Sequence, residues 1–494
     1  MNRVFLPQAP AVFLIATCFS ATFPAAAEGP YQATGIKIGE VTHDSAIIWT
    51  RLTEEAERIG NDAPLPVITY RDPKTNEIHP DPVSGKPDWD PIVAFPNGTS
   101  ISTIEGAAAG TDGDVRIAWR PTDSTEWEYT EWQSVDSSLD YTRQFTLTGL
   151  SARTGYAIRV DSRDPSGETG DSMTGSFRTA QIATDPSRVL FTVTTGSRYP
   201  QQDAPEGGYR MYNAMLDMTP DFFIHTGDIL YYDELAKTDA LARWHWQRMY
   251  SLATNVQFHR WVASYFIKDD HDTWRNDCWP SMYSPYMGKF TFEQGLDIFR
   301  EQVPMGEKTY RTFRWGKDLQ IWLVEGRDFR SANNDPDGPT KTIWGDEQKA
   351  WFKRTVAESD ATFRLLISPT PVVGPDRPNK RDNHSNDVFA HEGNEIRAFM
   401  SKQPNMFVIC GDRHWQYVSV DSKTRLREYS CGPTSDEHAG GWKQDNVLPE
   451  HEYLNVTGGF LSVEVVREGG RPFIAFRHYS VDGDLYNEDI RDAQ

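Results

Sequence analysis

The residues best suited to chemistry in this sequence lie in polar turns that follow hydrophobic runs. Carboxylates and imidazoles that converge on one place act first as metal ligands and second as acid–base groups. The sequence therefore predicts a metal site and favours a metal-dependent hydrolase. The turns are Thr195-Gly196-Ser197-Arg198, His225-Thr226-Gly227-Asp228, Lys268-Asp269-Asp270-His271-Asp272 and Gly411-Asp412-Arg413-His414.

Short, largely apolar segments precede these turns, at 189–194, 222–224, 264–267 and 406–410. Such runs are typical of strands covered on both faces, and ligands bind beyond the carboxyl ends of those strands. We expect the turns to meet at one edge of one buried sheet.

Asp269-Asp270-His271-Asp272 is the strongest of these signals. Its carboxylates repel one another unless a cation or a helix N-terminus compensates them. Helix capping is the simpler explanation, but it accounts for one Asp and not for three. Asp412 and His414 lie two apart, which puts both on one face of an extended backbone. Gly227-Asp228 alone is a common turn, so the specificity comes from the three motifs together.

Two kinds of region position these turns. Short alternating strands up to about residue 181 predict an antiparallel β-sandwich, with a Pro-, Asp- and Gly-rich insertion at about 54–113 that is either a surface excursion or a lid. From about residue 187, strands alternate with helices, which predicts an α/β domain over residues 182–494. Expected helices span 209–216, 238–250 and 346–358, and segments 460–466 and 472–477 should pair as a hairpin.

The length of 494 residues indicates at least two domains, and the net charge of −21 argues against a nucleic-acid-binding protein. Residues 1–27 read as a signal peptide, because Arg3 precedes an apolar stretch and Ala25-Ala26-Ala27 offers a cleavage site. We therefore expect a periplasmic or secreted protein without a stable membrane span, and a monomer. Removal of Cys18 leaves Cys278, Cys410 and Cys431, so at most one internal disulfide forms.

The three motifs resemble those of the calcineurin-like metallophosphoesterases, and more closely those of the PhoD-type alkaline phosphatases and phosphodiesterases. That family shows Gly-Asp-x-x-Tyr, then Asp-Asp-His-Glu followed by Asn, then Gly-Asp-x-His. In this chain the first motif is matched by Asp228 and Tyr231, the second by Asp269 to Asp272 with Asn276, and the third by Asp412 with His414. Two further segments also match the family, Glu325–Arg330 and the set Gly345, Gln348 and Trp351. The resemblance implies a four-layer α/β/β/α metallophosphatase domain, and the strands before it resemble a fibronectin-type III module.

The resemblance also implies roles for the residues in hydrolysis of a phosphoester substrate. Two cations bridged by Asp228 would activate water and clamp the phosphoryl oxygens. Asp270 and Asn276 would serve one metal, and Tyr231, Asp412 and His414 the other. His271 stands at the place of the catalytic histidine and would protonate the leaving alkoxide. Arg327 or Arg330 would neutralise charge on the phosphoryl oxygens, with surface ion pairing as the alternative for either.

One departure bears on the metals. The family usually carries a Cys ligand after the first strand, and this chain has Thr195-Gly196-Ser197 there. The remaining oxygen-rich set favours Ca²⁺, Mg²⁺ or Mn²⁺, and iron would be held less strongly. Two alternatives to a phosphatase stay open: a phospholipase D-like lipid phosphodiesterase, and a degenerate non-catalytic protein that binds glycans or surfaces.

Two late polar segments, Arg381-Asp382-Asn383-His384 and Asp436-Glu437-His438, are expected to be solvated turns. Closure of these segments over a substrate is the alternative.

Overall fold

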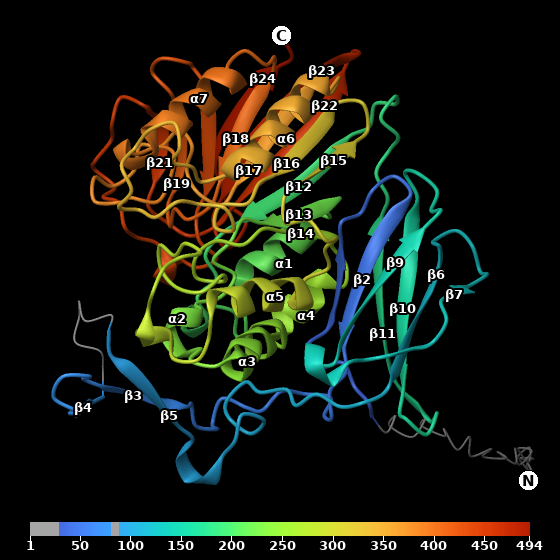
Figure 1. The fold of residues 1–494 in the computed structure, drawn as a ribbon. Coiled ribbons are helices and arrows are strands. Elements are labelled where there is room, and N and C mark those ends of the chain that lie inside the picture. Colours follow the sequence, from blue (N-terminus) through green and yellow to red (C-terminus); the bar gives the residue numbers. More distant parts are fainter. Residues whose placement is uncertain (1–28, 81–87) are drawn as a thin grey trace, which may run out of the picture.

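The computed structural model describes residues 29–80 and 88–494, so the predicted leader lies outside the described residues. Two large sheets face each other, and helices cover the outer face of each, while a β-sandwich formed by the N-terminal part of the chain lies to one side (Figure 1). The predicted four-layer α/β/β/α domain preceded by a β-sandwich is confirmed.

The first large sheet has nine strands and mixes parallel and antiparallel pairs. Its central strands β12, β13 and β14 pair in parallel, as expected for strands joined by helices. In spatial order the strands are β24 (Leu485–Asp492), β23 (Arg471–Tyr479), β22 (Phe460–Glu468), β12 (Val189–Thr194), β13 (Phe222–His225), β14 (Ser264–Phe266), β1 (Ile36–Gly39), β2 (Ser45–Arg51) and β9 (Thr142–Thr148). Strands β22 and β23 form the predicted hairpin.

The second large sheet has seven strands. In spatial order they are β15 (Arg311–Trp315), β16 (Leu319–Leu323), β17 (Phe363–Ser368), β18 (Met406–Cys410), β20 (Arg427–Cys431), β19 (Gln416–Val420) and β21 (His451–Asn455). The main core lies between the two sheets, where Phe191 and Phe222 of the first share a cluster with Ile321, Leu365 and Ile409 of the second. The central strands of both sheets are therefore buried on both faces, which explains why they are apolar.

Helices α1 (Arg210–Asp217), α3 (Asp239–Tyr250), α4 (Ala253–His259) and α5 (Phe292–Gln302) pack on the nine-stranded sheet. Helices α6 (Gly345–Glu358) and α7 (Ala390–Met400) pack on the seven-stranded sheet. The three predicted helices are confirmed as α1, α3 and α6. Helix α3 begins where the Leu241 N–H donates to the N-cap Thr238 Oγ1, and helix α5 begins with a capping box of Thr291 and Gln294. The remaining helical turns are α2 (Tyr232–Leu235), η1 (Pro96–Gly98), η2 (Ser137–Leu139), η3 (Tyr199–Gln201), η4 (Pro285–Met287), η5 (Asp387–Phe389) and η6 (Asp436–His438).

The β-sandwich shares a sheet with the rest of the molecule. Strands β1, β2 and β9 extend the nine-stranded sheet, because Gly39 pairs in parallel with Ser264. Across from them lies a smaller sheet of β11 (Thr169–Arg178), β10 (Gly155–Arg163), β6 (Asp114–Pro121), β7 (Glu128–Tyr129) and β8 (Gln133–Ser134). The sandwich is thus joined to the α/β part by main-chain hydrogen bonds.

The insertion between the sandwich strands carries a three-stranded sheet of β4 (Ile78–His79), β3 (Val67–Arg71) and β5 (Asp90–Ala94). It packs on the helical side of the nine-stranded sheet, where Tyr70 stacks on Tyr286 with ring centroids 5.3 Å apart. Its described part therefore forms a packed excursion beside α2 and α3 (Figure 1).

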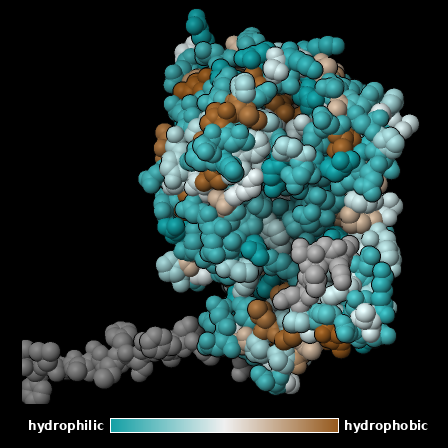
Figure 2. Space-filling model, turned by 90° about the vertical axis from the view of Figure 1, so that its left-hand side faces the viewer, coloured by the Kyte–Doolittle hydropathy of each residue, from teal (hydrophilic) through white to brown (hydrophobic). Residues whose placement is uncertain are grey.

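On the face shown in Figure 2, the described surface is largely hydrophilic, with apolar residues in small patches. In the described part of the chain no helix is both long and apolar enough to cross a membrane. Cys278, Cys410 and Cys431 are all buried and free. No disulfide therefore links these three thiols.

Candidate metal centre

The four predicted turns converge, but they come from two sheets. Strands β12, β13 and β14 belong to the nine-stranded sheet and β18 to the seven-stranded one, so the expectation of a single sheet is wrong. The carboxyl ends of the two sheets meet where Thr195 forms a parallel bridge with Pro433. The Asp412 N–H also donates to Thr195 Oγ1 over 3.3 Å. The strands before these four turns are apolar in both sheets, so their sequences do not indicate which sheet each strand joins.

Two of the predicted ligands sit on strained backbone. Asp228 and Asp412 have φ angles of +54° and +60°, in the left-handed region that residues other than glycine rarely adopt. Such strain concentrates at functional sites because the surrounding structure must hold it in place. Gly227, just before Asp228, has φ +106°, and a Cβ there would lie 2.6 Å from the Asp269 Cβ. Only glycine lets the β13 and β14 turns approach this closely.

Asp228 is buried, and none of the described arginines or lysines forms an ion pair with it. It is 1% exposed, and its Oδ1 has no hydrogen-bond partner among the described residues. Its Oδ2 lies 3.4 Å from Tyr231 Oη and 3.6 Å from His414 Nε2, and these last two atoms are 3.3 Å apart. Burial raises the pKa of Asp228 well above its usual range, because the Asp270 and Asp269 carboxylates add to the effect and His271, which lowers the pKa, offsets it only in part. The charge of Asp228 is therefore offset by an imidazole and not by an arginine or lysine.

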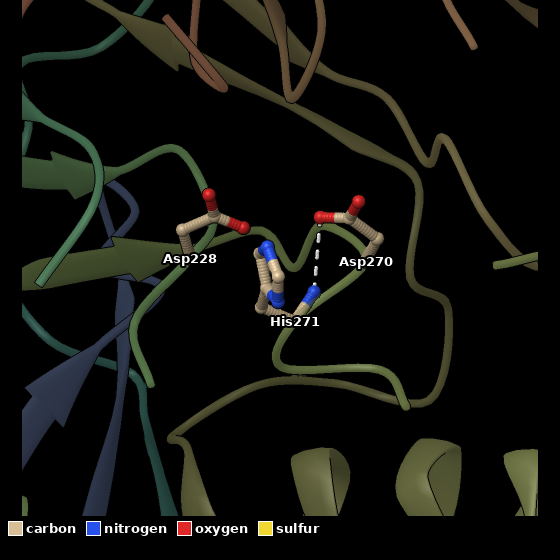
Figure 3. A group of neighbouring side chains, drawn as sticks. All are labelled: Asp228, Asp270 and His271. Carbon is tan, nitrogen blue, oxygen red and sulfur yellow. Dashed lines mark hydrogen bonds between the residues drawn. The ribbon is translucent and has the colours of Figure 1, made fainter. Parts of the chain in front are cut away.

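His271 is held by a carboxylate that sequence reasoning did not single out. Its Nδ1 lies 2.9 Å from Asp233 Oδ1, on α2. Burial by itself would lower the pKa of His271, but the carboxylates of Asp233, Asp270 and Asp228 raise it well above its usual value. The ring lies between the Asp228 and Asp270 side chains, and the backbone N–H of His271 donates to Asp270 Oδ1 over 3.0 Å (Figure 3). Asp233 thus fixes the His271 ring beside the Asp228 and Asp270 carboxylates.

Arg327 lies in the interior and not at the cavity. It is 0% exposed, and its guanidinium contacts Asp269 Oδ1 at 2.6 Å, Asp382 Oδ2 at 3.3 Å and Asp270 Oδ2 at 3.7 Å. Burial opposes ionisation of Asp270, but Arg327 and His271 lower the pKa of that carboxyl. Arg330 is also buried and donates to the Asp382 carbonyl over 3.0 Å. Arg327 thus pairs with carboxylates and Arg330 with a main-chain carbonyl and the Asn333 amide, and neither arginine lines the cavity.

A cavity of about 280 Å³ opens at the converging turns. Five of the predicted site residues line it: Asp228, His271, Asn276, Asp412 and His414. Tyr231 and Asp270 contact these residues from behind the wall. Sequence reasoning did not assign the other lining residues, which are Arg377, Lys380, Trp415, His438, Gly440 and Gly441.

A larger cavity of about 660 Å³ lies at the junction of the β-sandwich and β12, and it is lined by Arg153, Arg178 and Asp221 among others. Its wall contains neither histidine nor cysteine. The groups suited to metal and acid–base chemistry line the smaller cavity.

Both late polar segments were expected to be solvated turns, which is wrong for residues 382–384 and for His438, whereas Asp436 and Glu437 are exposed as expected. Asp382, Asn383 and His384 are fully buried, because Asp382 faces Arg327 and His384 Nε2 lies 2.9 Å from Glu392 Oε2. His438 is half-buried at the cavity. The sequence did carry a signal for His438, because this residue follows a strand, β20, as the other site residues do. That strand, Arg-Glu-Tyr-Ser-Cys, carries charges and did not resemble the other apolar runs.

The side chains fit bound cations. Three groups bring carboxylate or imidazole atoms within 4.8 Å of one another: Asp228 with Asp270 and His271, Asp228 with Asp269 and Asp412, and Asp270 with Asp277 and Asp382. Lys380 and Arg327 contact the third group, whereas Asp228 belongs to the other two and keeps an unpartnered buried oxygen. A cation beside Asp228 would remove this imbalance.

Comparison with known families settles which group of proteins has this arrangement. A family model described as PhoD-like phosphatase matches residues 191–447, more than half of the chain. The chain belongs to the PhoD-like phosphatase family. No curated protein matches the sequence.

Solved structures share the fold at low sequence identity. The structure of PhoD matches with a TM-score of 0.68 at 15% identity, covering 96% of this chain and 90% of that one. The purple acid phosphatase PPD1 from yellow lupin (Lupinus luteus) seeds matches with a TM-score of 0.59 at 10% identity, covering 92% of this chain and 73% of that one. This member of the PhoD-like family is a phosphoester hydrolase of the metallophosphatase type.

Proposed function

We propose that the protein is an exported, metal-dependent phosphoester hydrolase that prefers phosphomonoesters. The observation that carries the proposal is the cavity of about 280 Å³, which places Asp228, His271 and His414 on the same wall as two cations, Arg377 and Lys380. Carboxylates, an imidazolium and cations around a small cavity suit a compact dianion.

Cation binding would fall to the residues around Asp228. Tyr231, Asp412 and His414 would hold one ion and Asp270 and Asn276 the other, with Asp228 shared between them. Bound there, the cations supply Lewis-acid catalysis, lowering the pKa of water and neutralising charge on phosphoryl oxygens.

His271 supplies the proton for the leaving group. Its Nδ1 is held by Asp233 at 2.9 Å, which leaves Nε2 to carry the proton that is transferred. The leaving alkoxide oxygen takes that proton as the bond between phosphorus and oxygen breaks. Asp233 orients the ring and stabilises its charged form. His271 therefore matters most for poor leaving groups, which need protonation.

Arg377 and Lys380 bind the phosphoryl oxygens that face away from the leaving group. Lys380 Nζ contacts Asp277 Oδ1 at 2.6 Å, and Arg377 Nε lies 3.5 Å from Asp376 Oδ1. Both side chains therefore reach the cavity from anchored positions. Two cations match a phosphomonoester dianion better than a diester monoanion.

The test uses the mature chain with p-nitrophenyl phosphate and bis(p-nitrophenyl) phosphate, assayed with and without chelator. We expect chelator-sensitive hydrolysis with a higher kcat/KM for the monoester. Lys380→Met should lower the ratio of the monoester kcat/KM to the diester kcat/KM about 10-fold, because the variant lacks one of the two cationic side chains. Inactivity toward both substrates after metal addition would refute the function. Export is tested by N-terminal sequencing of the exported protein. We expect the mature chain to begin near Glu28.

A further inference from the structure

His438 reaches the metal centre from the seven-stranded sheet. It ends η6, in the loop after β20. That loop is fixed against the β12 turn, because Thr434 N–H and Thr434 Oγ1 both donate to the Gly196 carbonyl over 3.1 Å. Asp436 Oδ1 accepts from Gly458 N–H over 3.0 Å and anchors the other side. The His438 ring is therefore placed by main-chain contacts on both sides.

The His438 Nε2 atom has the spacing of a metal ligand. It lies 2.8 Å from Tyr231 Oη and 3.3 Å from His414 Nε2. Tyr231 Oη lies 3.4 Å from Asp228 Oδ2, and His414 Nε2 lies 3.6 Å from the same oxygen. Ligand atoms bound at about 2.0–2.1 Å around one tetrahedral ion lie about 3.3–3.4 Å from one another. Tyr231 Oη and His414 Nε2 thus each lie at about the spacing of metal ligands from both His438 Nε2 and Asp228 Oδ2.

Gln201 fixes the tautomer of His438. The amide Nε2 of Gln201 donates to the Glu437 carbonyl over 3.1 Å, so its Oε1 is the atom that faces His438 Nδ1, at 2.5 Å. An amide oxygen only accepts, and Nδ1 must therefore carry the proton. The free electron pair of the ring is left on Nε2, which points at Tyr231 and His414. Metal-binding histidines are oriented in the same way, by a hydrogen bond from their other nitrogen.

The turn after β12 contributes no side chain to the space around His414 and His438. A Cβ at Gly196 would lie 3.3 Å from the His414 Cδ2 and 3.4 Å from the His438 Cδ2. Ser197 points elsewhere, with its hydroxyl 3.0 Å from His225 Nε2. The rings of His414 and His438 thus fill the space that a side chain at position 196 would enter.

We propose that His438 is a metal ligand, and that with Asp228, Tyr231 and His414 it forms a site for a first-row transition-metal ion. Two imidazoles, a carboxylate and a phenol suit such an ion better than Ca²⁺ or Mg²⁺, which take mainly oxygen ligands. The inference rests on the proposed function only in that a cation binds beside Asp228. It narrows the expectation of Ca²⁺, Mg²⁺ or Mn²⁺, which was drawn from one imidazole, to Mn²⁺ or another first-row transition-metal ion.

The test measures Mn²⁺ binding to the full chain, by the EPR signal of free Mn²⁺ and by pulsed-EPR detection of nitrogen couplings. Wild type should bind Mn²⁺ through two imidazoles, and excess Ca²⁺ or Mg²⁺ should leave that ion in place. His438→Ala should weaken binding about 100-fold or more and leave one imidazole coupling, while Gln201→Leu should weaken it about 10-fold. His391→Ala, which removes an exposed histidine on α7, is the matched control and should change neither quantity.

A rescue experiment uses the space at position 196. In the His438→Ala background, Gly196→Cys should restore affinity and give a thiolate charge-transfer band with Co²⁺. Gly196→Ala in the same background carries the same backbone strain at φ +58° but supplies no ligand, and it should not restore binding.

Unchanged Mn²⁺ affinity and two remaining imidazole couplings in His438→Ala would overturn the proposal. Should that variant fail to fold by circular dichroism, Gln201→Leu decides in its place, and wild-type affinity there would also overturn it. Loss of hydrolysis in His438→Ala with unchanged metal binding would count against His438 as a ligand and leave the hydrolase proposal standing. A wild type that binds Mn²⁺ through two imidazoles but hydrolyses no phosphoester would refute the hydrolase and support His438.

Discussion

Two groups of buried carboxylates lie side by side at the converging sheet edges, and they differ in what balances their charge. Asp269, Asp270 and Asp382 face the Arg327 guanidinium, and Asp382 also lies 3.6 Å from Lys380 Nζ. Asp228 faces the Tyr231 phenol and the imidazoles of His414 and His271, and none of the described arginines or lysines forms an ion pair with it. The density of carboxylates therefore does not locate the metal; the lack of an arginine or lysine partner for Asp228 does.

Asp228→Asn should give the largest effect, because it removes the charge that attracts the cation. We expect kcat/KM for p-nitrophenyl phosphate to fall at least about 1000-fold, with little loss of stability. Steady-state kinetics and thermal unfolding measure the two quantities. Asp62→Asn, at an exposed position, is the control. Near-wild-type turnover would mean that the uncompensated carboxylate is not the catalytic one.

Arg327→Met should destabilise the protein, because Arg327 neutralises the first group of carboxylates. Its removal leaves Asp269, Asp270 and Asp382 buried without their guanidinium partner, which costs about 3–5 kcal/mol of unfolding free energy. Urea unfolding measures the change. Exposed Arg354→Met on α6 provides the comparison and should have little effect. An equal small effect of both variants would show that Arg327 does not balance these carboxylates.

His271→Ala tests the imidazolium that faces both groups. Turnover of an alkyl phosphate should fall about 100-fold or more, because that leaving group needs a proton. Turnover of p-nitrophenyl phosphate should fall much less, since nitrophenolate leaves without protonation. The ratio of the two rates is the measurement, and an equal loss for both substrates would contradict the acid role.

Glu392→Gln extends the comparison to a third kind of buried carboxylate, one that is hydrogen-bonded to an imidazole. Burial alone would raise the pKa of Glu392, but hydrogen bonding to His384 and Thr342 lowers it to about 2. A depressed pKa means that this stabilisation is present above about pH 4.5 and is lost as the pH falls toward 2. The variant should lose about 2–3 kcal/mol at pH 7, and the difference should shrink below pH 4.5. Urea unfolding at several pH values measures it; a difference independent of pH would exclude the charge as its cause.

Much of the fold was readable from local pattern. Apolar runs such as 189–194 and 406–410 predicted buried strands with the observed bounds, because a strand covered on both faces has no polar side. Helix α3 was predicted from its apolar spacing and begins after the capping residue Thr238. The motif residues Asp228, His271 and Asp412 were predicted to converge because each follows such a strand.

What the sequence did not determine depends on contacts between distant segments. Arg327 was expected at the substrate and lies buried against Asp269, since nothing near it in sequence shows which carboxylates it will meet. His438 was expected in a solvated turn, and it lies at the cavity because the loop after β20 pairs with the turn after β12.

The sequence by itself determined which residues end the buried strands, because the alternation and length of apolar runs are local properties. Only the tertiary structure decided that β12 to β14 and β18 belong to different sheets, and that their edges meet. It also decided which carboxylates are neutralised by arginine or lysine and which are left for a cation. Charge balance in the interior depends on distances of a few ångströms between segments far apart in the chain, and local sequence carries no record of those distances.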